Sequence, residues 1–283
     1  MDAAGYRTAQ AQSRESVNGT ENIDPSRAQA GAAVSGLDAS SLVPAAEGYE
    51  RWASTYDHDP NPLLAREERY LSPLLLDVRG KRILDLACGT GRWLEKLMAR
   101  GGVSGVGIDC SFAMLRVAKN KDAVTGRVAR AGCESLPLRT AYFDLAICSF
   151  ALAHIGDLGS MVRELARVTM AGADVFVSDL HPDAYTRGWG VGFRDKNRAM
   201  QIETVRRSIE AIVSVFRANG FECMLNETLW LGSPEQRVFE KAGKAHIFAD
   251  ASQVPAVLIC HFRRLASQAD VQFPRKHPEG VRL

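Results

Sequence analysis

A carboxylate and two glycines stand close together in the segment KRILDLACGTGRW (81–93), as Asp85, Gly89 and Gly91. The apolar run before them predicts a buried strand, and the residues after them have the pattern of a helix. A glycine turn at that point lets the backbone approach a ligand closely, and ligands of open α/β sheets bind outside the carboxyl ends of the strands. A second acidic residue, Asp109, ends the next predicted strand, 20 residues after Gly89. This is the position of the ribose-binding carboxylate in nucleotide-binding sheets.

Two classes of nucleotide compete for such a site: those that carry phosphates, and a cationic one that carries none. A dinucleotide fold prefers G-x-G-x-x-G, in which the third glycine allows close packing of helix on strand, but that position is Leu94 here. A Walker loop would need Gly-Lys-Ser or Gly-Lys-Thr, which this turn lacks. A diphosphate also gains nothing from Asp85, whereas a carboxylate can hold the cationic methionine end of S-adenosylmethionine by a charge-assisted hydrogen bond. We therefore predict S-adenosylmethionine as the cofactor; the alternative for Asp85 is that it merely caps the turn after its strand.

Strands and helices alternate around this turn. Short apolar runs predict strands, and apolar residues at i, i+3 and i+4 predict amphipathic helices. In chain order we expect strand 82–87, helix 91–101, strand 103–109, helix 111–121, strands 126–132 and 142–152, helix 157–170, strand 173–180, helix 203–220, and strands 221–231 and 256–264. Such alternation is typical of an α/β fold with a mostly parallel sheet, here of seven strands, and helices on both faces.

The rest of the chain is arranged around this domain. Residues 1–42 are small and polar without an apolar period, so we predict a disordered extension, with a short helix that docks on a partner subunit as the alternative. Residues 43–80 predict a helical lid over the sheet edge. The main domain spans 81–265 and contains an inserted loop at about 181–203, where the apolar period lapses, and residues 266–283 predict a flexible tail.

The composition is that of an ordinary globular protein, with 46% hydrophobic and 24% charged residues among 283. The net charge of +2 gives no reason to expect nucleic acid or an anionic membrane as a partner. No apolar run approaches the roughly 20 residues of a membrane-spanning helix, and the N-terminus shows no apolar signal segment. Six cysteines without a CxxC pair indicate structural thiols in a reducing cytoplasm rather than a metal or redox site. We predict a cytoplasmic protein that acts on a small molecule, and the sequence leaves homo-oligomerisation open.

The motifs resemble those of the class I methyltransferases. D-L-A-C-G-T-G (85–91) is similar to their motif I, in the variant whose first glycine is replaced, here by Ala87. GVGIDCSFAML (105–115) resembles their second motif, and AGCESLPLRTAYFDLAICSFALAHI (131–155) resembles their adenine-side motif and fourth strand. The N-terminal YERWASTYDHDPNP resembles the lid helix of the small-molecule branch that includes the ubiquinone and menaquinone C-methyltransferases. The resemblance covers roughly 48–264 and implies a Rossmann-like fold and S-adenosylmethionine as cofactor, but it does not specify the acceptor.

The resemblance also implies a set of cofactor-binding positions. They are Tyr56, Asp85, Ala87, Gly89, Thr90, Gly91, Asp109, Cys110, Met114, Gly132, Cys133 and Ser149. The motif I residues and Ser149 are expected beside the methionine moiety, Asp109 at both ribose hydroxyls and Met114 against the adenine. One departure is Gly132, where the family often has an aspartate that accepts a hydrogen bond from the adenine amino group. We expect the Cys133 N–H to contact the ring, and the adenine site to be slightly weaker or water-bridged.

Methyl transfer from a sulfonium is an in-line displacement, so the protein mainly aligns the reactants and excludes water. A base is needed only if the acceptor must lose a proton. His154 and His181 follow the fourth and fifth strands, and we predict both as catalytic residues. The alternatives are a structural or cofactor-edge role for His154 and a hydrogen bond from His181 to Asp179 or Asp183. Those last three residues also resemble a metal-binding set, but near-adjacent ligands on one loop rarely close a site, and we predict no metal.

Aromatic residues give the only indication of the acceptor. Tyr185, Trp189 and Phe193 lie four apart on the insert, and with Trp52 and Tyr56 of the lid they predict the walls of an apolar pocket. Packing of these rings against the lid is the alternative. We predict methylation of a small aromatic or hydrophobic acceptor on O, C or N. Two other functions stay open: methylation coupled to rearrangement or cyclisation of a prenyl-type substrate, and a non-catalytic cofactor-binding subunit.

Overall fold

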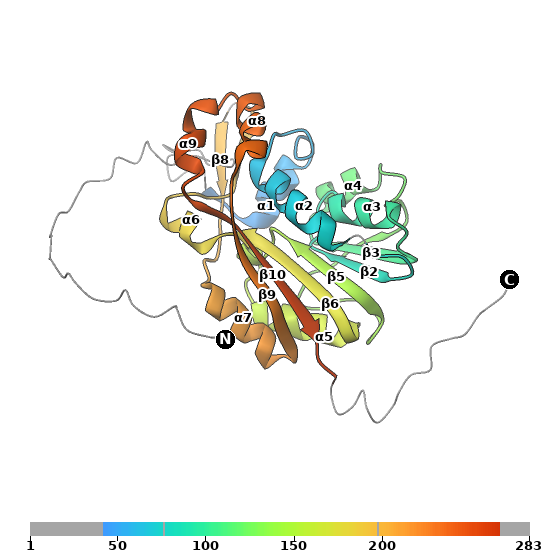
Figure 1. Cartoon of the computed structure of the whole chain (residues 1–283). Helices are drawn as coiled ribbons and strands as arrows, with labels where there is room; N and C mark the ends of the chain where they lie inside the picture. Colours follow the sequence, from blue (N-terminus) through green and yellow to red (C-terminus); the bar gives the residue numbers. More distant parts are fainter. Residues whose placement is uncertain (1–41, 76, 197, 267–283) are drawn as a thin grey trace, which may run out of the picture.

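A seven-stranded sheet forms the centre of the computed structural model, which describes residues 42–75, 77–196 and 198–266 (Figure 1). Its strands, in spatial order, are β4 (Val128–Arg130), β3 (Ser104–Asp109), β2 (Arg82–Leu86), β5 (Phe143–Ser149), β6 (Thr169–Leu180), β10 (Pro255–Arg264) and β9 (Phe221–Trp230). Only β10 is antiparallel to its neighbours. The predicted mostly parallel seven-stranded sheet is therefore confirmed.

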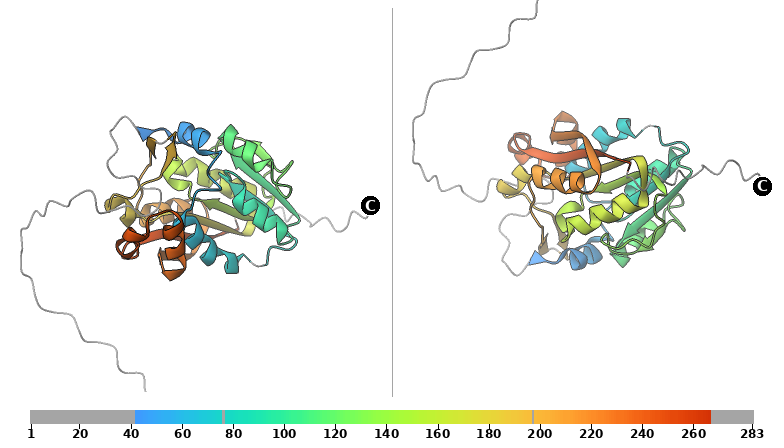
Figure 2. Two further views of the ribbon diagram at one scale, coloured as in Figure 1. Left: turned by 90° about the horizontal axis from the view of Figure 1, so that it is seen from above. Right: turned by 90° about the horizontal axis from the view of Figure 1, so that it is seen from below.

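Helices cover both faces of this sheet (Figure 2). On one face α5 (Leu158–Val168) packs beside α7 (Ile209–Ala218), and α2 (Pro62–Leu74) and α3 (Arg92–Ala99) lie on the other. The remaining helices are α1 (Ala45–Trp52), α4 (Phe112–Ala118), α6 (Pro182–Thr186), α8 (Ser233–Lys241) and α9 (Phe248–Ala251), with the 3-10 turns η3 (Leu152–His154) and η4 (Ala245–Ile247).

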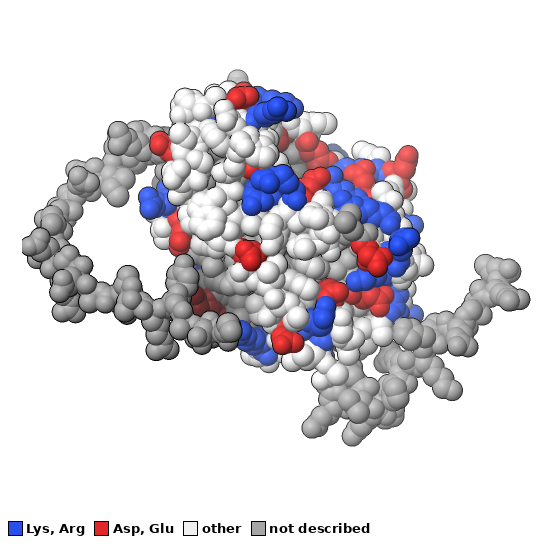
Figure 3. Space-filling view, viewed as in Figure 1, with Lys and Arg blue, Asp and Glu red and all other residues white. Residues whose placement is uncertain are grey.

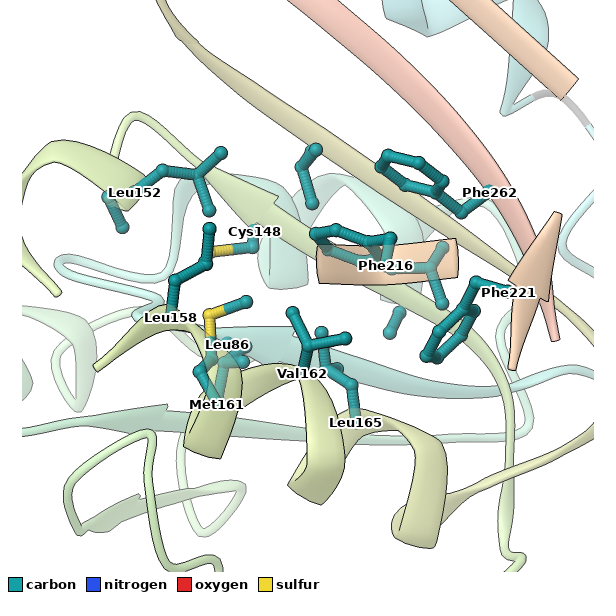
Figure 4. Packing of buried hydrophobic residues seen from close by; sticks show 14 of the residues in the cluster. Leu86, Cys148, Leu152, Leu158, Met161, Val162, Leu165, Phe216, Phe221 and Phe262 are labelled. Atoms are coloured by element: carbon teal, nitrogen blue, oxygen red, sulfur yellow. The ribbon is translucent and has the colours of Figure 1, made fainter. Parts of the chain in front are cut away.

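The central strands are apolar on both sides, which produces two cores. Because successive strand residues point to opposite faces, Ile83 and Leu145 pack against α2 and α3, whereas Leu84 and Ala146 pack against α5 and α7. Figure 4 shows the second core, in which aromatic rings from α7, β9 and β10 meet the leucines and Met161 of α5. This two-sided burial explains the near-continuous apolar runs of the sequence.

A small sheet at the edge of the domain joins the N-terminal helix to the insert. Its strands are, in spatial order, β1 (Leu42–Val43), β8 (Arg198–Ile202) and β7 (Gly192–Asp195). The Trp52 ring of α1 stacks on Phe193 of β7 at 5.4 Å, and Arg51 forms an ion pair with Asp195. We call β1, α1, β7 and β8 together the cap, because α1 lies over the carboxyl-end rim of β3 through contacts with α4.

Several boundaries differ from those predicted. The insert is not a loop but contains α6 and the β7–β8 hairpin. The helix expected from residue 203 begins at Ile209, where Ser208 accepts a hydrogen bond from the Ala211 N–H. The strand expected to reach residue 152 ends at Ser149, because Phe150 adopts a positive φ of 51°. The predicted extension and tail lie, apart from Leu42 and Ala266, outside the described residues.

Charges of both signs are interspersed on the face shown in Figure 3, where Lys and Arg over α2 and α3 alternate with Asp and Glu. This mixing agrees with the small net charge of +2. Within the described ranges, every helix is too short or too polar to cross a bilayer.

Candidate functional site

A cavity of about 220 Å³ lies at the carboxyl ends of β2, β3 and β5, beneath α1. The predicted cofactor residues that line it are Tyr56, Ala87, Gly89, Asp109, Cys110, Met114, Gly132, Cys133 and Ser149, and His154 lines it as well. The lining residues that we did not predict are Ala45, Ala46, Tyr49, Ser111, Glu134, Phe150, Ala151 and Ile155. The structure thus brings most of the predicted set into one place, although its members are spread over about 100 residues of sequence.

The glycine turn wraps one wall of the cavity. Gly89 and Gly91 have φ values of 54° and 76°, in the left-handed region that glycine adopts without steric cost. Ala87 has the same conformation, with φ of 54°, although it carries a Cβ. Both Ala87 and Gly89 line the cavity, so the turn presents little side-chain bulk to a ligand.

Asp109 ties this turn to the next strand. One carboxylate oxygen accepts a hydrogen bond from Gly89 N and the other from Ser111 N, both at 2.8 Å. Burial raises the pKa of Asp109, against the lowering effect of these backbone donors. Each carboxylate oxygen accepts more than one hydrogen bond, and the residue lines the cavity. Its remaining acceptor capacity suits a pair of ligand hydroxyls.

Asp85 lies behind the turn rather than in the lining of the cavity. It is 2% exposed, does not line the cavity, and accepts a hydrogen bond from Leu94 N in the first turn of α3 at 2.9 Å. Burial raises its pKa to about 7, although the bond from Leu94 opposes this shift. Asp85 therefore caps α3, the alternative weighed above. Thr90, which donates to Asp57 at 2.6 Å, and Gly91, the N-cap residue of α3, also shape the turn without lining the cavity.

The charge of the cavity still suits a cation. Its lining includes the carboxylates of Asp109 and Glu134 and no Lys or Arg among the described residues. Opposite charge favours a ligand with a sulfonium and an ammonium group, whereas a diphosphate would meet two carboxylates without a compensating cation. The acidic lining of the cavity thus fits S-adenosylmethionine.

Tyr49 and His154 meet in this cavity. The Tyr49 hydroxyl lies 3.0 Å from His154 Nε2, and the rings are edge to face at 5.2 Å. His154 Nδ1 lies 3.3 Å from the backbone oxygen of Glu203. Since a carbonyl only accepts, Nδ1 carries the hydrogen and Nε2 accepts from Tyr49. Burial lowers the pKa of His154 to about 4, so its imidazole is neutral at pH 7.

Comparison with known proteins agrees with this geometry. A family model described as "Methyltransferase domain" matches residues 83–172. A malonyl-(acyl-carrier protein) O-methyltransferase of Pseudescherichia vulneris is 31% identical over 175 residues, which cover 59% of this chain and 67% of that protein. The chain belongs to the S-adenosylmethionine-dependent methyltransferases. The predicted family, enzyme class and cofactor are therefore confirmed.

Two further comparisons describe this methyltransferase. A ubiquinone biosynthesis O-methyltransferase of Ralstonia nicotianae is 35% identical over 131 residues, 45% of this chain and 53% of that protein. The chain thus spans about half the length of that relative. The fold is similar to that of an S-adenosylmethionine-dependent methyltransferase from Mesorhizobium loti, with a TM-score of 0.56, 22% identity, and coverage of 71% of this chain and 100% of the other.

The structure places His181 of this methyltransferase away from the cavity. His181 is 5% exposed, and its Nε2 lies 3.1 Å from Thr228 Oγ1 of β9. Its Nδ1 accepts a hydrogen bond from Asp183 N at the start of α6. Burial lowers its pKa. His181 therefore caps a short helix and, unlike His154, does not line the cavity. Among the described residues no cluster of His, Cys, Asp and Glu is arranged to hold a metal ion.

The predicted aromatic pocket is packed instead. Trp189 and Tyr185 are 2% and 5% exposed and belong to the core on the α2 side, and Phe193 stacks on Trp52. None of these four residues lines the cofactor cavity. Of these four, Trp52 borders a second, smaller space of about 40 Å³, together with Tyr49 and Tyr56. The alternative, packing against the lid, describes the insert aromatics better, because the hairpin needs its own hydrophobic contacts.

Two residues that sequence reasoning missed carry much of the site. Tyr49 lies seven residues, close to two helical turns, before Tyr56, so helical spacing would have indicated it. Glu67 of α2 gives no such signal. It is fully buried and accepts hydrogen bonds from four side chains: Arg92, Trp93, Ser149 and Ser178. Glu67 thereby ties α2 and α3 to the ends of β5 and β6 beside the cavity.

Proposed function

We propose that this methyltransferase transfers a methyl group to an oxygen atom of a small organic acceptor. The observation that carries the proposal is the Tyr49–His154 pair in the same cavity as the glycine turn and Asp109. The names of the two relatives, both O-methyltransferases, support oxygen as the accepting atom.

The cavity residues divide the work of binding. We infer that Asp109 holds the ribose hydroxyls with the oxygens that already accept from the turn, and that Met114, buried on α4, packs on the adenine. Ala87 and Gly89 border the methionine moiety, and Cys133 offers its backbone N–H to the base. When bound, S-adenosylmethionine supplies a methyl group that passes to the acceptor oxygen as the carbon–sulfur bond breaks, leaving S-adenosylhomocysteine.

The Tyr49–His154 pair removes the acceptor's proton in this proposal. The lone pair of His154 Nε2 holds the Tyr49 hydroxyl hydrogen. As the acceptor hydroxyl loses its hydrogen to the Tyr49 oxygen, the Tyr49 hydrogen moves to Nε2, and the imidazolium later returns the proton to water. Positioned acid–base groups of this kind typically contribute 10²–10⁴-fold to a rate. The pKa of about 4 keeps the His154 imidazole neutral throughout the neutral range, so Nε2 carries no proton of its own before the transfer.

We infer that the acceptor enters beside His154 and places only its hydroxyl next to Tyr49, which lines the cofactor cavity. A cleft of about 610 Å³ shares Ala45 and His154 with the cofactor cavity. Leu42 and Val205, 49% and 46% exposed, and the charged Arg206 also line it. This mixture suits an acceptor with an apolar body and a polar or anionic substituent.

The test is to measure binding and turnover separately in Tyr49→Phe and His154→Gln. We expect the dissociation constant for S-adenosylmethionine, from calorimetry, to stay within threefold of wild type. We expect kcat to fall by about 10²-fold or more, followed as the 14-dalton mass gain of phenolic acceptors, whose hydroxyl is still protonated at neutral pH. The matched control is His246→Gln, because His246 is exposed in η4.

Each alternative has its own outcome. Wild-type turnover in both variants would exclude the pair as the base. Tight cofactor binding without any methylated product in cell extract would favour the non-catalytic subunit, and a mass gain with a changed carbon skeleton would favour coupled rearrangement. Failure to bind S-adenosylmethionine would overturn the proposal.

A further inference from the structure

The turn that carries His154 is bound by a distant segment of the chain. Residues 152–156 connect β5 to α5, and residues 203–207 run beside them after β8. The guanidinium of Arg207 donates three hydrogen bonds to backbone oxygens of the turn, at 2.8, 2.6 and 2.9 Å: those of Leu152, Ile155 and Gly156. No other side chain in the described residues contacts this turn through so many of its carbonyls.

Further contacts hold the turn from the same segment and from the sheet. Val205 N donates to Ala153 O at 2.7 Å, and Glu203 O receives His154 Nδ1 at 3.3 Å. From β6, the buried carboxylate of Asp179 accepts from Ala153 N at 2.8 Å. The turn is therefore clamped on both sides of His154.

We propose that Arg207 is a positioning residue, which fixes the turn 152–156 so that His154 Nε2 faces the Tyr49 hydroxyl. The planar guanidinium can bind several oxygens at once in a fixed arrangement, which a lysine ammonium on a flexible stem cannot. Hydrogen bonds to a charged donor are about twice as strong as neutral ones, and three of them converge on five residues. The proposal rests on the proposed role of His154 as base, and Arg207 lies outside the residues 83–172 that the family model matches.

A brace that only stabilises the fold would not affect the chemistry of His154. Here the same contacts keep its Nδ1 against Glu203 O and its ring half-buried. The nearest charged and titratable groups are Tyr49 on α1, Asp179 on β6, and Glu203 and Arg207 on the clamping segment. Arg206 shares the cleft with His154, and Asp109 and Glu134 share the cofactor cavity with it. Release of the turn exposes the imidazole to water, which favours its protonated form.

The experiment follows the His154 ring directly by NMR in protein labelled with ¹³C-histidine, with its signal assigned through His154→Gln. In wild type we expect no titration of His154 above pH 5. In Arg207→Met we expect its pKa to rise by at least one unit toward 6.5, kcat to fall at least tenfold, and the dissociation constant for S-adenosylmethionine to stay within threefold. Arg207→Lys, which keeps the charge, should restore only part of the loss.

Arg100→Met is the matched control. Arg100 also donates to two backbone oxygens, those of Ser72 and Leu75, but it lies at the C-terminal end of α3, whereas the glycine turn precedes the N-terminal end. We expect this variant to leave the His154 titration and kcat unchanged.

The inference would be overturned if folded Arg207→Met showed the wild-type titration of His154. If Arg207→Met does not fold, the same result in Arg207→Lys would overturn it. The NMR titration needs no turnover, so it tests the inference independently of the proposed function. A wild-type kcat in His154→Gln would instead show that the proposed function is wrong.

Discussion

At the scale of single residues, the site separates two carboxylates that the sequence presents alike. Asp85 and Asp109 both end a strand before a turn, but the first turns inward to α3 and the second borders the cavity. The difference depends on which backbone donors lie within reach once the helix has formed. Asp85 lies directly beneath the first turn of α3, where a buried N–H needs an acceptor.

Asp85→Asn is expected to change how stability depends on pH. The folded pKa of about 7 lies above the unfolded value near 3.8, so between these values the folded state binds more protons and stability falls as pH rises. Between these two pH values the free energy of unfolding falls by a few kcal/mol because of Asp85. Asparagine keeps an oxygen for Leu94 N but does not ionise, so the variant should lose this part of the slope in urea unfolding at pH 5, 6, 7 and 8.

In Asp85→Asn the free energy of unfolding should still fall somewhat as pH rises, because burial also raises the pKa of Asp109 and brings that of Asp179 to about 6. Asp122→Asn, at an exposed position, is the control and should leave the wild-type slope. An identical slope in wild type and Asp85→Asn would show that Asp85 ionises without cost where it lies.

Sequence reasoning at this scale succeeded where a motif fixes the backbone. Asp109, Gly89 and Met114 line the cavity because the strand–turn–helix geometry leaves them no other direction. It did not indicate that His181, Tyr185 and Trp189 are buried away from the cavity, because their burial depends on contacts with β9 and with the α2 side of the sheet, formed by residues distant in sequence.

At the scale of elements, the cap places Tyr49 over the cavity, and Tyr56 lines the cavity from the turn that follows α1. Glu50 of α1 fastens the cap to the core by accepting from Ser111 Oγ at 3.0 Å and from Ala113 N at 3.1 Å. The hairpin of the cap could not be read from the sequence. Its strands are short, and their apolar side chains pack on α1 rather than on the main sheet, so no pattern of the main fold extends to them.

Glu50→Ala is expected to loosen the cap without disturbing the sheet. Hydrogen bonds to a charged group at an exposed site contribute about 1 kcal/mol, or a factor of about five. Amide exchange in α1 and the dissociation rate of S-adenosylmethionine should rise by about that factor, while exchange in β5 stays unchanged. Mass spectrometry of hydrogen exchange and stopped-flow fluorescence measure the two quantities.

Glu47→Ala tests whether the effect is specific to this contact. Glu47 lies on the same helix, but among the described residues its side chain pairs with Arg51 alone, one turn away. It should leave both rates near wild type, since exposed pairs of this kind contribute little. Equal rates in Glu50→Ala and Glu47→Ala would mean that the cap is held by its hydrophobic contacts alone.

At the scale of the whole molecule, one sheet supports two cores. The central strands supply Ile83 and Ile147 to one face and Leu84 and Cys148 to the other. The alternation of strands and helices along the sequence predicted helices on both faces of the sheet. The near-continuous apolar runs agree with this arrangement, because strands buried on both faces have no polar side. Because the same strands contribute side chains to both cores, loss of packing on one face also removes support from the other. We therefore expect the two cores to unfold together.

Phe216→Ala tests this coupling from one face only. Phe216 of α7 is fully buried, stacked on Phe262 at 3.9 Å and edge-on to Phe221 (Figure 4). Its truncation should cost about 3–5 kcal/mol through lost contacts and a cavity. Trp93, buried in the opposite core, contributes to the fluorescence. If the sheet couples the cores, urea transitions followed by fluorescence and by far-UV circular dichroism shift together by the same amount. Met224→Ala, 45% exposed on β9, should shift neither, and two separated transitions in Phe216→Ala would show that each face is stable without the other.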